Sequence, residues 1–325
     1  MDLISGVEAL AASVATAEAV VPVGARTHWE VGNPPRDATE IRAPAGIVAY
    51  EPDDLTVTVG AGTSYADLVS ALAAHGQECP LDPRDPAATV GGVVASGLSG
   101  IRRLRHGPLR DQVLEVRYLD AGGRLVKGGG PTVKNVTGYD LPRLFVGSLG
   151  TLGLLVQLTL RCRPLPEAAC WVRADAPVDR YRAAARLTDG SCSWIRLEGA
   201  AADVDAQAEG LEPGDTPSLP DGAHRGRISI APGAVETVGR ALERIDGVRW
   251  LAEVAVGTVH VAADDAAALN GARTVASEHG GWLLREAGGA GLDGFGRELP
   301  NADLMRRIKD AFDPAGKFSP GRLPL

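Results

Sequence analysis

The chain has 325 residues, 45% of them hydrophobic, and a formal net charge of −8 at pH 7. This length holds one large domain or two ordinary ones, and the composition is typical of a globular protein with a sizeable core. The negative charge argues against nucleic acid as a partner, and no stretch approaches the roughly 20 apolar residues of a membrane-spanning helix.

The N-terminus and the cysteines bear on where the protein works. The first residues carry Asp2 and Glu8 and have no basic region, so we interpret them as a helix rather than a signal peptide. The cysteines are widely spaced without a C-x-x-C pair, which argues against a zinc or iron–sulfur site within the chain. Free thiols in a large chain fit a reducing compartment, so we expect a cytoplasmic protein.

The first elements are a helix, a short strand and a turn. Apolar residues at helical spacing predict a helix over 3–17, and a strand is predicted over 19–23. The strand runs into Gly24-Ala25-Arg26-Thr27-His28. This turn has the small and basic residues of a phosphate site, but it is also an ordinary turn.

A strand over 55–59 then leads through a glycine turn into a helix over 64–75, which Ser64 and Asp67 cap. A Rossmann dinucleotide site would need a small residue where Tyr65 stands and an acidic residue about 20 residues further on. Tyr65 is not small, and no acidic residue ends a strand at that distance, because the region there is the glycine-poor CPLDPRDP. The Walker phosphate-binding pattern is absent too. The sequence therefore argues against a nicotinamide Rossmann domain.

The stretch CPLDPRDPAATVGGVVASGLSG, from Cys79 to Gly100, is apolar, rich in glycine and almost uncharged after Asp85. Because glycine has no Cβ, backbone N–H groups here can approach an anionic ligand closely. Close packing of a short helix on a sheet explains the glycines equally well. Both interpretations stay open at this point.

A basic cluster over 102–110 follows, either solvated or facing an anionic ligand or partner. Alternating residues over 112–120 and 124–127, separated by a glycine turn, predict a hairpin. The apolar run over 154–162 predicts a long buried strand.

The second half alternates short strands and helices. Strands are predicted over 170–174, 192–198, 225–231, 249–256, 257–262 and 281–287, and helices over 177–188, 233–246, 264–279 and 302–312. This alternation predicts an antiparallel sheet with helices on one face. The acidic segment 200–224, rich in Pro and Gly, predicts a mobile surface loop.

Several passages are informative through their order and spacing. They are PVGARTHWEVG, YEPDDLTVTVGAGTSYADL, DPRDPAATVGGVVASGLSG, GPLRDQVLEVRYLDAGGRLVKGG, VKNVTGYDLPRLFVGSLGTLGLL and the closing FDPAGKFSPGR. Together they resemble the FAD-binding domain of the vanillyl-alcohol oxidase/p-cresol methylhydroxylase (PCMH-type) flavoproteins. The resemblance covers residues 20–165 and the last segment of the chain.

This resemblance implies an α+β fold. It comprises a PCMH-type FAD-binding domain of two subdomains over 1–165 and a smaller antiparallel-sheet cap domain over 166–300. A C-terminal helix and tail over 301–325 would return to the FAD domain.

The resemblance also implies FAD as the cofactor. The turn 24–28 and the stretch 89–100 would enclose its diphosphate, residues 150–155 would lie near the adenine, and residues 134–140 near the flavin. The implied cofactor-binding residues are Gly24, Ala25, Arg26, Thr27, His28, Asp82, Pro83, Thr89, Gly91, Gly92, Ala95, Ser96, Gly97, Gly100, Lys134, Asn135, Gly138, Tyr139, Asp140, Gly150, Gly153, Leu154 and Leu155.

Some of these positions have an alternative interpretation. His28 raises the question of a covalent flavin linkage, but the covalent histidine of relatives falls at about Thr27 here, so we expect non-covalent FAD. Tyr139 and Asp140 could form a buried hydrogen-bonded pair instead of touching the flavin.

In this family the cap supplies the substrate face over the flavin. A 2-hydroxy-acid dehydrogenase needs a cation for the carboxylate and a base for the hydroxyl proton. Our candidate catalytic residues are His260, Arg285 and Tyr139, with His279 and Glu286 as further candidates. The alternatives are a half-buried strand residue for His260, a surface ion pair for Arg285 and Glu286, and a helix end for His279.

The clustered histidines of the family's metal-assisted hydroxy-acid dehydrogenases are missing from this chain. The segment Glu278-His279-Gly280 is only a faint echo of them. We therefore expect no metal site, and this departure argues against independent substrate oxidation.

Three functions remain open. We favour an FAD-binding subunit of a glycolate-oxidase-like 2-hydroxy-acid dehydrogenase complex, which accepts or relays electrons through FAD. Its partners would be other oxidoreductase subunits, including an iron–sulfur protein, and any membrane association would run through them. The alternatives are a self-sufficient FAD-dependent dehydrogenase or oxidase of a small alcohol or hydroxy acid, and a cofactor-free scaffold subunit.

Overall fold

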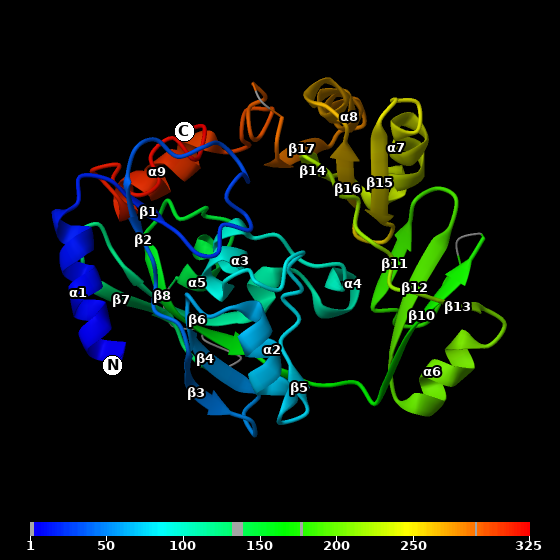
Figure 1. Ribbon diagram of the computed structural model, residues 1–325, viewed down its shortest axis with the longest axis horizontal. Helices are drawn as coiled ribbons and strands as arrows, with labels where there is room; N and C mark the ends of the chain where they lie inside the picture. The colour runs from blue at the N-terminus through cyan, green and yellow to red at the C-terminus, as the bar shows by residue number, and fades with distance from the viewer. Residues whose placement is uncertain (1–2, 132–138, 176–177, 290) are drawn as a thin grey trace.

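The computed structural model of the chain describes residues 3–131, 139–175, 178–289 and 291–325. Within these ranges two large antiparallel sheets lie side by side (Figure 1). The smaller sheet belongs to the N-terminal half. Its strands, in spatial order, are β3 (Ile47–Glu51), β4 (Thr56–Gly60), β8 (Leu154–Arg161), β6 (Val113–Leu119) and β7 (Leu125–Gly129).

Three helices bury one face of this sheet. They are α2 (Tyr65–Ala73), α3 (Val90–Ser96) and α5 (Leu141–Phe145). Leu68, Val93 and Phe145 from these helices pack with Val116 and Leu158 from the central strands in one apolar core. The predicted capping box at α2 is present, since Ser64 Oγ accepts a hydrogen bond from the Asp67 N–H at 3.0 Å.

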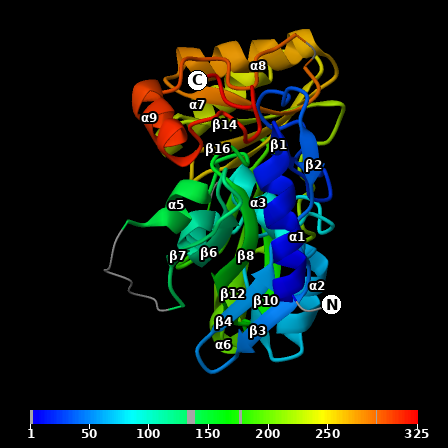
Figure 2. The same cartoon turned by 90° about the vertical axis from the view of Figure 1, so that its left-hand side faces the viewer.

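Helix α1 (Leu3–Thr16) runs along the outside of the same half (Figure 2). Its Val14 packs on Leu154 and Val156 of β8 in a second, smaller core. The central strand is therefore buried on both faces, as its continuous apolar run predicts.

The C-terminal tail pairs with the start of the chain. Strand β1 (Val20–Pro22) lies parallel to β2 (Thr39–Ile41), and Val20 also bridges Phe318 of the tail. Helix α9 (Ala302–Phe312) precedes the tail, and Phe312 contacts the rings of Tyr118 and Phe145. The last helix and the tail therefore lie on the N-terminal half, as Figure 1 shows.

The second sheet has eight strands, all antiparallel. In spatial order they are β13 (Glu212–Gly214), β10 (Ala168–Ala174), β12 (Ser193–Gly199), β11 (Ala185–Thr188), β15 (Val248–Glu253), β16 (Thr258–Ala263), β14 (His224–Ser229) and β17 (Trp282–Ala287). A separate pair, β5 (Gln77–Glu78) and β9 (Arg163–Pro164), lies where the chain passes from the first half to the second.

Successive side chains along these strands point to opposite faces of the sheet. One face packs on α6 (Ala201–Ala208), α7 (Val235–Leu242) and α8 (Ala266–Glu278). The other face looks toward the N-terminal half and carries polar side chains. Arg227 of β14 and His260 of β16 are register partners and therefore share this inner face.

Two predictions in this half are wrong. The expected helix over 177–188 is instead a turn and strand β11 in its described part, because Ala185 and Leu187 alternate inward against β12 and β15. The expected loop over 200–224 begins with helix α6 and the edge strand β13. Residues 201–208 are half alanine and favour a helix, and Val204 packs it against β10 and β12, whereas the Pro and Gly residues that predicted a loop all lie after residue 208.

The other predicted elements agree with the structure to within a few residues at each end. They include α1, α2, α9, the β6–β7 hairpin and the cap strands, and the α+β fold class with an antiparallel-sheet cap is confirmed. Several short elements were not predicted: strands β2 and β3, the β5–β9 pair, helices α4 (Arg103–His106) and α5, and a 3₁₀ turn (Leu109–Asp111). None of the helices in the described ranges is long and apolar enough to cross a membrane.

Candidate active site

A first cavity lies in the N-terminal half, between the turn after β1, the turn after β4, the start of α3 and the segment that leads into β8. Many of the implied cofactor residues line it. These are Gly24, Ala25, Arg26, Thr27, His28, Thr89, Gly91, Gly92, Ala95, Ser96, Gly150, Gly153, Leu154 and Leu155. The fold therefore gathers them around one space, which we call the backbone cavity.

Glycines let the walls of the backbone cavity approach one another. A Cβ on Gly24 would stand 2.1 Å from Thr89 Oγ1, the oxygen that caps α3 by accepting the Gly92 N–H. A Cβ on Gly91 would stand 2.8 Å from the Cβ of Ala61 in the turn after β4. The structure shows the close packing of α3, and the same packing leaves bare backbone along the cavity, so the ligand interpretation of the glycine-rich stretch remains a prediction.

Two polar atoms test whether a dinucleotide fits the backbone cavity. Ser148 Oγ and Arg322 Nη1 are buried, and neither has a hydrogen-bond partner among the described residues. Both residues line the cavity. A hydroxyl, a guanidinium and a glycine-rich wall suit a ligand that carries hydrogen-bond acceptors and negative charge, as a dinucleotide diphosphate does.

Other implied cofactor residues lie elsewhere. Asp82, Pro83 and Gly100 line the neighbouring cavity described below. Gly97 ends α3 with a φ of 69°, and a Cβ there would meet Gly147 at 2.8 Å, so this glycine permits a close backbone contact. Lys134, Asn135 and Gly138 fall outside the described residues.

Tyr139 and Asp140 do not form the buried pair that we considered. The Tyr139 side chain is 89% exposed and lines neither cavity. Asp140 is exposed and caps α5 through the Arg143 N–H, with a salt bridge of 2.7 Å to the Arg143 side chain. Both residues are therefore exposed. From the sequence alone, a residue that caps a helix could not be distinguished from a residue of the active site.

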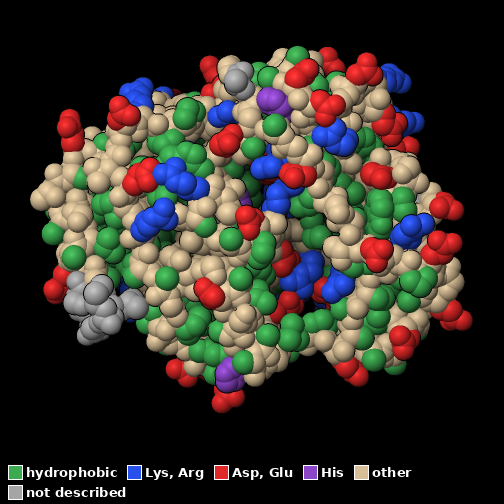
Figure 3. Space-filling model, in the orientation of Figure 1, with side chains coloured by type: hydrophobic (Ala, Val, Ile, Leu, Met, Phe, Trp, Pro, Cys, Tyr) green, Lys and Arg blue, Asp and Glu red, His purple; other side chains and the backbone are tan. Residues whose placement is uncertain are grey.

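A second cavity of about 840 Å³ opens beside the first, between the N-terminal half and the inner face of the eight-stranded sheet. Thr27 and His28 line both cavities. Figure 3 shows basic and acidic side chains gathered in the hollow between the two halves. We call this space the polar cavity.

The cap contributes a buried ion pair to the polar cavity. Arg227 Nε donates to Glu286 Oε1 at 2.8 Å, and Arg227 Nη1 donates to the backbone oxygen of Ser99 at 2.8 Å. Burial opposes the ionisation of Glu286, but Arg227, His260 and Arg84 still hold the pKa of this carboxyl below its ordinary value. Glu286 is therefore an ionised carboxylate within the cavity wall, not the surface group that we considered.

His28 faces the polar cavity from the turn after β1. Its Nδ1 lies 3.2 Å from Thr27 Oγ1. Burial lowers the pKa of His28 below its ordinary value of 6.5, and Glu286 offsets part of this effect. The imidazole is therefore neutral near pH 7 and able to accept a proton.

His260 is almost fully buried on β16. Its Nε2 lies 3.1 Å from Glu253 Oε1, and its Nδ1 has no hydrogen-bond partner among the described residues. It lines the polar cavity on the same face as Arg227. The structure thus brings this candidate to the cavity together with a carboxylate partner.

Arg285 lies outside both cavity linings. Its guanidinium donates to the backbone oxygens of Gly288 at 2.8 Å and Gly32 at 2.6 Å, which ties the cap to the N-terminal half. His279 ends α8, where its Nδ1 lies 2.8 Å from the backbone oxygen of Val275. The structure places His279 as a helix-end residue and Arg285 as a cross-link between the two halves.

Arg84 lines the polar cavity, although it was not among the site residues predicted from the sequence. Its Nη1 donates to the backbone oxygen of Pro220 at 2.9 Å, and Asp221 is 3.8 Å away. Burial lowers the pKa of Arg84 somewhat, yet this guanidinium stays charged at neutral pH. The only signal in the sequence was its position between two Asp-Pro steps, in a stretch that already suggested a ligand.

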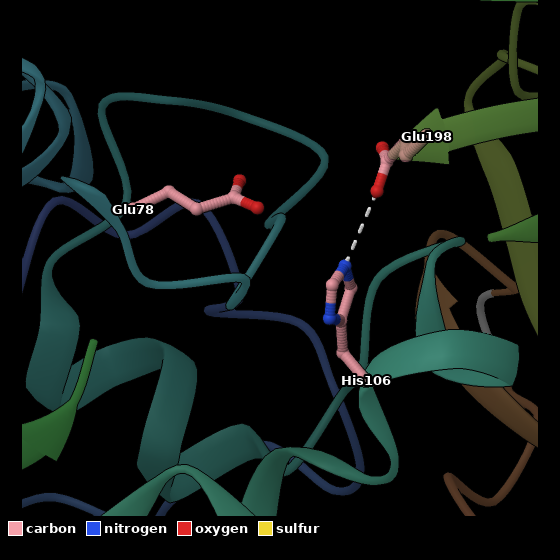
Figure 4. A group of neighbouring side chains, drawn as sticks. All are labelled: Glu78, His106 and Glu198. Atoms are coloured by element: carbon pink, nitrogen blue, oxygen red, sulfur yellow. Dashed lines mark ion pairs between the residues drawn. The ribbon is translucent and has the colours of Figure 1, made fainter. Parts of the chain in front are cut away.

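Glu78, His106 and Glu198 form a cluster around Arg102, which lines the polar cavity. Figure 4 shows the imidazole directed at Glu198, with 3.5 Å between Nε2 and Oε2, and Glu78 opposite. The guanidinium of Arg102 already hydrogen-bonds Glu78 at 2.8 Å and Glu198 at 3.2 Å, and it binds Asp82 as well. An arginine therefore supplies the cation that these carboxylates need, and we assign the group as an ion-pair network across the two halves.

Comparison with known proteins adds the family. The signature of the FAD binding domain family matches residues 5–129. Glycolate oxidase subunit GlcE of Escherichia coli (strain K12) is 31% identical over 332 residues, which cover 92% of this chain and 91% of that protein. The chain belongs to the GlcE family.

Two further similarities are partial or structural. D-lactate dehydrogenase of Archaeoglobus fulgidus is 39% identical over 112 residues, and the match spans only 25% of its length. Alkyldihydroxyacetonephosphate synthase superposes with a TM-score of 0.69 at 13% identity, covering 98% of this chain and 74% of that one. The second similarity shows the fold alone.

These findings confirm the resemblance to PCMH-type flavoproteins. This GlcE-family chain is an FAD-dependent oxidoreductase, and FAD is its cofactor. The hypothesis of a cofactor-free scaffold loses its support, because the backbone cavity and the family agree on a dinucleotide.

Proposed function

We propose that this chain oxidises a small 2-hydroxy acid in the polar cavity, as the FAD-binding subunit of a glycolate-oxidase-like complex. The proposal departs from the expectation drawn from the missing histidine cluster, because the polar cavity carries arginines and histidines of its own. The observation that carries the proposal is the shared wall of the two cavities at Thr27 and His28. A ligand that fills the backbone cavity as far as this wall meets a molecule in the polar cavity there. FAD supplies the acceptor for the two electrons that leave the substrate carbon.

The residues of the polar cavity suit a 2-hydroxy acid. Arg84 is cationic. Among the described residues its Nη1 donates to one backbone oxygen and lies 3.8 Å from Asp221, and Glu286 is a further carboxylate nearby. The other donors of this guanidinium can bind the substrate carboxylate. Arg227 is fixed by Glu286 and by the backbone of Ser99, which orients its remaining donors. A substrate held by its carboxylate would be oriented for reaction before any bond changes.

His28 is the proposed base for the hydroxyl proton. It lies at the wall that the cavities share, and burial keeps its imidazole neutral. His260, paired with Glu253, is the second candidate for this role. Since the pKa of His28 is lowered, the neutral form predominates above pH 6.5 and is lost as the pH falls through the lowered pKa.

The pH dependence of turnover tests this assignment. We expect kcat/KM for a 2-hydroxy acid, measured with a dye acceptor and normalised to bound flavin, to rise with pH below 6.5 and then level off. In His28→Gln the rise should disappear and kcat/KM should fall about 10²- to 10⁴-fold. The exposed His75→Gln is the matched control and should leave both unchanged. An unchanged acid limb in His28→Gln would transfer the role to His260.

The proposed complex includes other oxidoreductase subunits, one of them an iron–sulfur protein. Support comes from the name of the E. coli relative, which is a subunit, and from the lack of cysteine clusters in the sequence. Isolation of the protein from its native cells should yield flavin and non-haem iron in one complex of constant stoichiometry. A chain that elutes alone, loaded with FAD and fully active toward a physiological acceptor, would contradict this part.

A further inference from the structure

The C-terminal tail delivers an arginine to the backbone cavity. Arg322 is 7% exposed, although it stands only three residues from the end of the chain. It lines the cavity together with the turn 24–28 and with Ser148. Its guanidinium carbon lies 5.2 Å from the ring centre of Trp29. No residue of the tail was among the predicted site residues.

The charge of Arg322 has no counter-ion within the described parts of the chain. Nη1 is buried without a hydrogen-bond partner, and no salt bridge to Arg322 is found among these residues. Burial, and secondarily the positive charge of Arg285, lower the pKa of Arg322 to about 10. The guanidinium thus remains charged at neutral pH in a place where the described residues supply no counter-ion.

Two neighbouring arginines have hydrogen-bond or ion-pair partners for their positive charge. Arg26, which contacts the same Trp29 ring, forms a salt bridge with Glu40. Arg285 donates to two backbone oxygens. A buried cation without such partners is strongly unfavourable, and an aromatic face compensates only a small part of the cost. Arg322 is therefore matched to something that the protein itself does not provide.

The cofactor FAD carries negative charge, opposite in sign to that of Arg322. The diphosphate is the anionic part of FAD, and guanidinium groups bind phosphate oxygens through paired hydrogen bonds. We propose that Arg322 binds the diphosphate of FAD, so that the C-terminal tail forms one wall of the cofactor site. The inference concerns cofactor binding and does not depend on which substrate the enzyme oxidises.

The tail is anchored so that Arg322 stays at the cavity. The Ser319 N–H donates to the Val20 oxygen at 2.8 Å, and Ser319 Oγ donates to the Gly150 oxygen at 3.0 Å. The backbone oxygen of Arg322 accepts the Asn33 N–H at 3.3 Å. These contacts attach the tail to β1 and to the segment before β8, both of which border the backbone cavity.

Substitution of Arg322 separates ligand binding from folding. In Arg322→Met we expect the Kd of the apoprotein for FAD to rise about 10- to 100-fold, the range for loss of charge-assisted hydrogen bonds. The Tm of the apoprotein should stay equal or increase, because a buried uncompensated charge is removed. Arg322→Lys should bind FAD with an intermediate Kd. Arg306→Met, on the exposed face of α9, is the matched control and should change neither quantity.

Two results would overturn the proposal. An FAD affinity of Arg322→Met within about twofold of wild type would show that Arg322 does not bind the cofactor. A large drop in the Tm of the apoprotein, with the Tm increase on adding FAD preserved, would make Arg322 a structural residue instead.

A measurement on the wild-type protein covers the case in which the variants fold poorly. Amide hydrogen exchange in residues 313–322 of the apoprotein should slow when FAD or saturating ADP is added, since both carry the diphosphate. Riboflavin, which lacks it, should leave this exchange unchanged. Equal slowing by riboflavin, or no slowing by FAD, would contradict the role assigned to Arg322.

Discussion

The two cavities of this chain meet at Thr27 and His28 but are built in opposite ways. The walls of the backbone cavity are mainly glycines, small side chains and apolar residues from the N-terminal half, with Arg26 from the turn after β1 and Arg322 from the C-terminal tail. The walls of the polar cavity carry charged side chains from both halves. A cofactor site of this kind is sensitive to added volume, whereas the substrate site is sensitive to changes of charge. The predictions below test that difference, from the largest expected effect to the smallest.

Adding one methyl group to the backbone cavity should have the largest effect. In Gly24→Ala the new Cβ would stand 2.1 Å from Thr89 Oγ1, which cannot move away without releasing the cap of α3. We expect FAD affinity, measured by titration of the apoprotein, to fall about 100-fold, because displacements of about 1 Å have effects of this size at organised sites. Gly233→Ala, which meets nothing within 4 Å, is the matched control. Equal affinities in the two variants would mean that backbone proximity does not define the cofactor site.

Removing a charge from the polar cavity should affect the substrate and not the cofactor. In Arg84→Met we expect KM for a 2-hydroxy acid to rise about 10- to 100-fold, the range for loss of a hydrogen bond to a charged group. The Kd for FAD should stay within twofold of wild type. The matched control is Arg240→Met, at an exposed ion pair on α7. A parallel loss of FAD would show that the two cavities are not separable by charge.

The ion-pair network between the halves should contribute to stability. Glu198 is buried, and although burial opposes its ionisation, His106, Arg102 and Arg196 lower its pKa from 4.5 to about 2. We expect Glu198→Gln to lower the unfolding free energy by about 1–3 kcal/mol at pH 7. Glu212→Gln, at an exposed pair, should change it by less than about 0.5 kcal/mol.

The pH dependence of this stabilisation has a definite sign. Because the pKa of Glu198 is lower in the folded protein, its contribution is complete above pH 4.5 and is lost as the pH falls toward 2. The difference in unfolding free energy between wild type and Glu198→Gln should therefore shrink over that range. A difference that stays constant down to acid pH would exclude an ionised Glu198 as its cause.

The smallest effect should come from Tyr139, which the family resemblance made a candidate for both cofactor binding and catalysis. Its side chain is 89% exposed and lines neither cavity. Tyr139→Phe should leave the FAD Kd and kcat/KM within twofold of wild type. A fivefold loss of either, measured in the same assays, would return Tyr139 to the site.

The contrast between the cavities also explains what the sequence could predict. The turn 24–28 and the glycine-rich run 88–97 each carry their signal locally, so their convergence on a cofactor could be expected from order and spacing. Arg84, Arg227 and Glu286 carry no such signal, because each is an ordinary charged residue until the two halves come together. Arg322 could not be predicted either, because its proposed partner is the cofactor and no residue of the chain signals it.

The errors in the cap have a comparable origin. Residues 185–188 have the composition of a helix, but their two neighbouring strands recruit them into the sheet. Segment 201–208, AADVDAQA, is rich in alanine and favours a helix, but the Pro and Gly residues after it dominated the composition of 200–224. Long-range pairing therefore outweighed local preference in the first place, whereas in the second the helical signal was hidden by the composition of a longer segment.

The most direct test of the account is an anaerobic titration of the FAD-loaded chain, without partners, followed by the visible absorption of its flavin. We predict that glycolate or lactate bleaches the flavin, that acetate, which has no hydroxyl group, does not, and that Arg84→Met needs a much higher concentration of the acid. If the loaded chain stayed oxidised with every 2-hydroxy acid while the assembled complex was reduced, substrate oxidation would lie in a partner subunit. The polar cavity would then not be the substrate site.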